Sequence, residues 1–382
     1  MARYLYLFFC FLFLEICSVK AQITGASVGA DSVSNAVFPV LSYSSTEGFV
    51  GGAVYNRYDF SGNIQPFKNY LQSSGLVSTK GFVEIEGKYE RTRSFGKRIR
   101  TTVDAYFHRY TADIFFGIGN EVPFSKSRWD NDYYYFQSVS LGLEYKLRKA
   151  LYQRQKNNGH FDLQLGLGTE YQVPYVKKDQ SSFAQRMPYG YKGGWINYLT
   201  TGFVWENRDS EFDPHHGNRA EFDLRYSPEL ISKYGLTSFR FEYRQYFYLL
   251  HWLTVANRLE TRYVTGNIPY WEMSTLGGEN DLRGYPLNRF MGNASIAYTL
   301  ELRAWFFKFP RFYNLKLGGQ LFTDTGRVFT GKDNFNDVFH GYKQTFGFGG
   351  AMSMFNPDFI LRGEIGFSDE VARIYIGIGY LF

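Results

Sequence analysis

The chain has only two cysteines, Cys10 and Cys17, among its 382 residues. Both lie in the first 21 residues, so a chain without that segment has no disulfide to stabilise it. Long apolar runs are equally scarce, because no later segment approaches the ~20 consecutive apolar residues that a membrane-spanning helix needs. These absences exclude both a disulfide-rich secreted domain and a helical membrane protein.

The first 21 residues have one early positive charge, Arg3, followed by an apolar run over Tyr4–Leu14 and a small residue, Ala21, at the end. This pattern predicts a secretory signal peptide over residues 1–21, with a mature chain that begins at Gln22. A lipoprotein anchor at Cys17 is the less favoured alternative, because the residues just before it are not small.

Aromatic residues are abundant, with 32 Tyr and 38 Phe, although the mean hydropathy is only −0.32. Apolar and polar residues alternate over long segments, most clearly over 133–148 and 238–249. Such runs exceed the ~9–11 residues that a tilted strand needs to cross a bilayer, whereas a soluble sandwich has no need of them. An exported, aromatic-rich, alternating chain is typical of an outer-membrane β-barrel.

The alternation predicts an all-β fold, a transmembrane antiparallel β-barrel of about 16 strands that fills residues 38–382. A short periplasmic segment, 22–37, is expected to precede it. Long outer loops are expected at 174–191, 267–292 and 326–341, with short turns and both termini on the periplasmic side. The predicted strands are 38–44, 48–59, 70–80, 81–92, 97–110, 132–148, 160–173, 192–206, 217–228, 236–250, 251–266, 293–307, 313–325, 342–355, 357–367 and 371–382.

The chain ends in an alternating segment, RIYIGIGYLF. An outward-facing apolar row is predicted on this barrel-closing strand, made of Ile374, Ile376, Ile378, Tyr380 and Phe382, with Gly377 and Gly379 facing inward. Only the short segment Phe38–Ser44 is available to the first strand, so the seam between the first and last strands is expected to be weakly paired.

Four stretches, in order, resemble one family. They are the turn WENRDSEFDPHHG with Arg208, Asp209, Phe212, Pro214 and Gly217; LGGENDLRGY over 276–285; FTDTGRVF over 322–329; and the closing region from Gly347, with Asn356 and Pro357 at a tight turn. Together they are similar to the bacterial surface antigen superfamily, the BamA/TamA-like barrels of outer-membrane assembly and translocation. Members that handle clients have periplasmic POTRA repeats, and residues 22–37 are too few for one repeat.

The resemblance implies that the loop bearing Arg283, Gly284 and Tyr285 folds into the barrel and that its arginine meets acidic residues on the inner wall. The alternation places Glu301 and Asp324 on that wall, and a planar guanidinium can pair with two carboxylates. We call this arrangement the loop latch. The alternative is an ordinary outer loop whose arginine is solvated.

The remaining groups of polar residues indicate neither a metal site nor a catalytic site. His215 and His216 are neighbours on a turn, and adjacent residues rarely converge on one metal ion. His108 has no nucleophile motif nearby, so a barrel hydrolase is not expected. We therefore expect no enzyme activity, no catalytic residue, no cofactor and no metal.

The resemblance implies a bacterial outer-membrane barrel that assists insertion, assembly or translocation of proteins or lipids. It would work through a flexible seam between its first and last strands and would catalyse no reaction. A passive pore or structural barrel without clients is the alternative. The expected partners are outer-membrane lipids, with unfolded outer-membrane proteins or a separate periplasmic protein as further candidates. Nucleic acid is excluded by location.

Overall fold

The computed structural model describes residues 33–44, 48–62, 64, 67–95, 99–153, 159–176, 180–312, 314–353 and 360–382. The expected signal peptide over 1–21, the segment 22–32 and the turn at Asn356 and Pro357 lie outside these residues. Within them, no helix is long and apolar enough to span a membrane.

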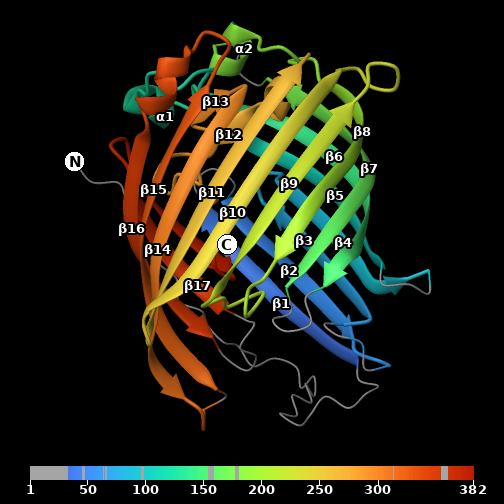
Figure 1. Cartoon of the computed structure of the whole chain (residues 1–382). Helices are drawn as coiled ribbons and strands as arrows, with labels where there is room; N and C mark the ends of the chain where they lie inside the picture. Colours follow the sequence, from blue (N-terminus) through green and yellow to red (C-terminus); the bar gives the residue numbers. More distant parts are fainter. Residues whose placement is uncertain are drawn as a thin grey trace.

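Sixteen antiparallel strands form one sheet that curls into a barrel (Figure 1), and each strand pairs with its neighbour in sequence. They are β1 (Val33–Ser44), β2 (Gly48–Asp59), β3 (Asn69–Ser78), β4 (Val83–Ser94), β5 (Ile99–Ile114), β6 (Tyr135–Gln153), β7 (His160–Tyr175), β8 (Gly194–Glu206), β9 (Gly217–Ser227), β10 (Leu236–Leu250), β11 (Leu253–Gly266), β14 (Ala294–Phe309), β15 (Leu315–Phe329), β16 (Lys343–Ser353), β17 (Ile360–Phe367) and β18 (Ala372–Ile378). The predicted all-β barrel of about 16 strands is confirmed.

The side chains of each strand alternate between the outside and the lumen, as the sequence predicts. On β6, Leu143 is half exposed on the outer face while Ser138 is buried inside. On β10, Phe239 and Phe241 are exposed outside and Glu242 is buried inside. The period of two therefore assigns each residue of a strand to a face.

Short elements gather at one end of the barrel, which we call the long-loop end (Figure 1). They are α1 (Lys126–Asp130), α2 (Ser182–Arg186), η1 (Tyr270–Glu272), η2 (Phe335–Phe339) and the small hairpin of β12 (Ser274–Leu276) and β13 (Phe290–Gly292). Phe183 of α2 and Tyr270 of η1 pack in a buried cluster with Phe115, which follows β5, and Phe136 of β6. This cluster joins three loops and covers the long-loop end.

The first strand is longer than predicted. β1 begins at Val33, not at Phe38, and pairs with β2 along its whole length, from Val33–Asp59 to Ser44–Gly48. The expectation of a short first strand, and of a separate segment reaching to residue 37, is therefore wrong. The alternation in Val33–Val37 is too weak to predict a strand, and backbone pairing with β2 forms it.

The last strand is shorter than predicted. β18 ends at Ile378, and Gly379 has a positive φ of 82°, a conformation that glycine adopts without strain. The chain then turns into the lumen, where Phe382 is buried against Tyr246. The prediction of an outward row that continues through Tyr380 and Phe382 is wrong, because alternation cannot show where a chain leaves its sheet.

The strand order of the sheet starts at β1 and stops at β18. Among the described residues, no ladder of backbone hydrogen bonds joins these two strands. β18 pairs with β17 over Ala372–Ile378 only, while β1 is a full-length strand, so the first and last strands of the sheet differ in length.

Candidate functional site

The connection between β11 and β14 enters the lumen. It passes through η1 and the hairpin β12–β13. Its tip, residues 277–289, lies inside the barrel and packs against the inner face of the wall. Leu282 and Arg283 have no exposed surface, and Tyr285 and Phe290 pack edge to face beside them. The predicted inward-folded loop is thus present, with an apolar part that excludes water from its charged part.

Arg283 makes the central contacts of this loop. Its Nη2 and Nε donate to Asp324 at 2.9 and 3.0 Å, and its backbone N–H donates to the same carboxylate at 3.1 Å. Its Nη1 lies 2.6 Å from Glu301, and its guanidinium stacks on the ring of Phe322 at 3.5 Å. The structure therefore brings Arg283 together with both predicted acceptors, in the planar geometry that a guanidinium favours.

Sequence reasoning missed a third acceptor, Glu364 on β17, which lies 3.3 Å from Arg283 Nη1. Arg303 also binds Glu301, and Arg362 also binds Glu364. Asp324 differs, because within the described chain Arg283 is the only Lys or Arg within ion-pair distance of it. The loop latch is thus a buried network in which one carboxylate depends on one loop arginine.

Gly284 and Tyr285 connect the loop to the last hairpin. Gly284 has a φ of 110° and lies so close to the backbone of Phe367 that a Cβ atom would overlap it. Its N–H donates to the Tyr375 hydroxyl of β18 at 2.9 Å, and the Tyr285 hydroxyl donates to Asp369. The predicted latch residues therefore fix the loop to β17 and β18 as well as to β14 and β15.

A second anchor, also missed, holds the start of the loop to the opposite strands. Glu272 of η1 accepts from Arg225 of β9 at 2.8 and 3.0 Å, and Arg225 also pairs with Glu170 of β7 at 2.9 Å. Arg262 of β11 donates to the Glu272 carbonyl at 3.3 Å. The alternation places Arg225 and Glu170 inside, but nothing in the sequence shows that Glu272 reaches them.

A third contact closes the long-loop end. Arg289 donates to both carboxylate oxygens of Glu370, at 2.7 and 2.6 Å, and to the carbonyl of Val122 at 2.6 Å. Its guanidinium lies over the rings of Phe116 and Phe290. The loop that follows β5 and the turn between β17 and β18 are thereby joined through the inward loop.

The carboxyl-terminal tail occupies the other end of the lumen. Arg303 donates to the carbonyl of Phe382 at 3.0 Å and lies over the Tyr380 and Phe382 rings at 4.1 and 4.8 Å. Because Arg303 also binds Glu301, the tail and the loop latch share one network. Of the residues predicted for a barrel-closing strand, Gly377 lies in β18, while Gly379, Tyr380 and Phe382 belong to this tail.

The family turn between β8 and β9 has a structural role. Arg208 pairs with Glu206 at 2.7 and 2.8 Å, while Asp209 accepts the backbone N–H groups of His215 and His216 at 2.9 and 3.1 Å. The other three predicted residues complete the turn: Pro214 is buried, Phe212 is exposed, and Gly217 has a φ of 102°. Asp213 of this turn accepts from the Trp305 indole at 3.1 Å, which ties it to β14.

Burial and charge have opposite effects on the loop's ionisable groups. Burial disfavours ionisation of Glu272, but Arg225 and Arg262, together with a hydrogen bond to Glu170, outweigh this effect and hold its pKa below the usual value. Burial also disfavours the charge of Arg283, yet Glu301 and Asp324 raise its pKa. Asp281 makes no ion pair within the described residues. Burial raises its pKa to about 7, although backbone N–H groups of Gly277 and Leu282 donate to it and the charge of Arg258 also lowers its pKa.

A family model described as the Omp85 superfamily domain matches residues 46–382. The chain belongs to the Omp85 superfamily. Among solved structures, this Omp85 barrel is similar to BamA from Haemophilus ducreyi lacking POTRA domains 1–3, with a TM-score of 0.58 and 14% identity over 92% of this chain and 70% of that one.

Two structures of CdiB are similar as well. The protein from Escherichia coli has a TM-score of 0.59 at 11% identity, and the protein from Acinetobacter baumannii has a TM-score of 0.53 at 14% identity. Each comparison covers 91% of this chain, but only 62% and 60% of the two CdiB chains. At this identity the likeness concerns the fold. No curated protein matches the sequence.

Replacing Arg283 tests the loop latch. Arg283→Ala leaves Asp324 buried without a cation, which costs on the order of 3–5 kcal/mol, so we expect lower resistance to unfolding and larger, noisier conductance in planar bilayers. Arg283→Lys is expected to keep only part of the wild-type stability and low conductance, because an ammonium group cannot reproduce the planar contacts of a guanidinium. Glu279→Ala, an exposed change in the same loop, is the control. Equal behaviour of Arg283→Ala and the control would contradict the latch.

The raised pKa of Asp281 should make the free energy of unfolding depend on pH. Because its folded pKa is about 7, above the ordinary value of 3.8, its protonation stabilises the fold below about pH 4, and this contribution is lost as the pH rises toward 7. The loss is expected to be on the order of 1–3 kcal/mol. The free energy of unfolding of wild type and Asp281→Asn, measured from pH 4 to 8, should diverge in this window. Parallel curves would refute the prediction.

Proposed function

We propose that this Omp85 barrel lies in the bacterial outer membrane and assists the insertion, assembly or translocation of proteins there, through the seam between β1 and β18. The observation that carries the proposal is the order of the sheet, which begins at β1 and ends at β18 with no ladder between them in the described residues. An unpaired strand edge presents N–H and C=O groups that can pair with another strand.

The occupied lumen supports the same proposal. The inward loop crosses the barrel between β9 and β17, and the tail fills the space around Tyr246 and Trp305. A conducting porin would instead need a water-filled constriction lined by charges. A client would therefore meet the barrel at its seam and not in its lumen.

The last strands are held more firmly than the first. β17 and β18 are bound to the inward loop through Glu364 and Tyr375, and the contacts described for that loop include none with β1. Movement of β1 and its neighbours away from β18 would thus open the seam while the loop latch stays intact. Lipids of the outer membrane and a client strand are the partners that this geometry admits, and a separate periplasmic protein would have to deliver the client.

Depletion of the protein in its own host tests the proposal. We expect other outer-membrane proteins to lose abundance, and wild type to restore it. A variant with a disulfide between β1 and β18 should not restore it until a reductant is added, because the seam cannot open. The matched control is a disulfide between Ile365 and Ile374, paired residues of β17 and β18, which should leave complementation intact.

Unchanged abundance of other outer-membrane proteins on depletion, with reduced uptake of small solutes, would overturn the proposal and favour the passive pore. Full complementation by the locked seam would also overturn it, because assembly would then proceed elsewhere on the barrel.

A further inference from the structure

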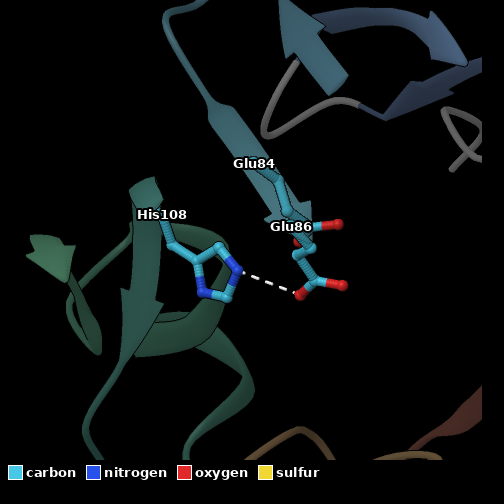
Figure 2. A group of neighbouring side chains, drawn as sticks. All are labelled: Glu84, Glu86 and His108. Atoms are coloured by element: carbon cyan, nitrogen blue, oxygen red, sulfur yellow. Dashed lines mark hydrogen bonds and ion pairs between the residues drawn. The ribbon is translucent and has the colours of Figure 1, made fainter. Parts of the chain in front are cut away.

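A second group of charged side chains lies on the lumen wall away from the inward loop. Glu84 and Glu86 of β4 and His108 of β5 point toward one another (Figure 2), and one ligand atom from each lies within 4.8 Å of the others. His108 Nε2 is 3.0 Å from Glu86. Ile85 and Phe107, their neighbours on the same strands, are exposed on the outer face, so the group itself faces the lumen.

Within the described residues, Glu84 and Glu86 differ from the other strand glutamates, each of which has a Lys or Arg beside it. Among the described residues, Glu84 and Glu86 have no Lys or Arg within ion-pair distance, and His108 is the sole ion-pair partner of Glu86. Every other glutamate on a described strand has an Arg or Lys within 4.0 Å: Glu90, Glu144, Glu170, Glu206, Glu221, Glu242, Glu260, Glu301 and Glu364. A bound cation would supply the positive charge that the described part of the chain does not place beside Glu84 and Glu86.

The imidazole is already oriented for a ligand role. The Tyr110 hydroxyl lies 3.2 Å from His108 Nδ1 and 3.4 Å from Glu84. Without an ion, Nε2–H donates to Glu86 and Nδ1 accepts from the hydroxyl. With an ion bound, Nδ1 would donate to the hydroxyl, which would donate to Glu84, and the lone pair of Nε2 would then be free for the ion. Metal-bound histidines are held in this way through their second nitrogen.

We propose that Glu84, Glu86 and His108 bind a divalent transition-metal ion such as Zn²⁺. One imidazole and two carboxylates suit such an ion better than Mg²⁺ or Ca²⁺, which prefer oxygen ligands alone. The Glu86 side chain is 53% exposed and can rotate toward the ion, while the ladder between β4 and β5 holds the other two in place. Three protein ligands leave a coordination position open to the lumen.

The test uses the mature chain without a polyhistidine tag, refolded in detergent, with Zn²⁺ as the probe in calorimetry and Co²⁺ as the spectroscopic probe. We expect one Zn²⁺ per chain and visible absorption from bound Co²⁺. His108→Ala should weaken binding at least 100-fold and Glu86→Gln about 10-fold.

His160→Ala is the matched control. His160 also lies beside a strand carboxylate, Asp162, but Arg148 is 3.2 Å from its Nε2, and a cation in that position excludes a metal. The control should bind Zn²⁺ like wild type. Because Glu86 is exposed, Glu86→Gln should fold even if His108→Ala does not. Folding of each variant is checked by the change in its electrophoretic mobility after heating, which a folded barrel shows. A wild-type chain without a stoichiometric site, or equal affinity in Glu86→Gln, would overturn the proposal.

Discussion

Burial of the Arg283 guanidinium is the constraint on which the rest of the structure depends. A charge without exposed surface is tolerable only where carboxylates surround it, and here they come from β14, β15 and β17. The loop that bears Arg283 must therefore stay in the lumen while these strands stay in register. Removing the arginine would leave Asp324 unpaired, so the position of the loop and the arrangement of the strands are coupled.

The coupling reaches both ends of the barrel. At the long-loop end, Glu272 binds Arg225, and Arg289 binds the turn between β17 and β18. At the other end, Arg303 connects Glu301 to the carboxyl-terminal tail. These contacts, with those of Glu170 and Val122, hold β7 through β18 and the loop after β5 around a filled lumen. Within the described residues, β1 to β4 are held mainly by their ladders, and the proposed function places the incoming strand at the edge of β1.

The sequence predicts the barrel and part of its site, for reasons that can be named. Period-two alternation assigns Glu301 and Asp324 to the lumen, and the resemblance around Arg283 supplies the inward loop. The same alternation assigns Glu364 inside, so this acceptor could have been found. The Glu272–Arg225 contact could not, because the path of a loop through a lumen leaves no periodic signal. Nor could the tail, since Tyr380 and Phe382 continue the pattern of β18 after the backbone has left it at Gly379.

The most direct test of the account is a double-mutant cycle between Arg283 and Asp324, with Arg283→Met and Asp324→Asn, read as the free energy of unfolding of the barrel in lipid. If the buried pair governs the loop, the double variant should lose less stability than the sum of the single losses, with a coupling on the order of 2 kcal/mol or more. A cycle between Arg283 and the exposed Glu279 should show none. Losses for Arg283 and Asp324 that add within about 0.5 kcal/mol would contradict the account.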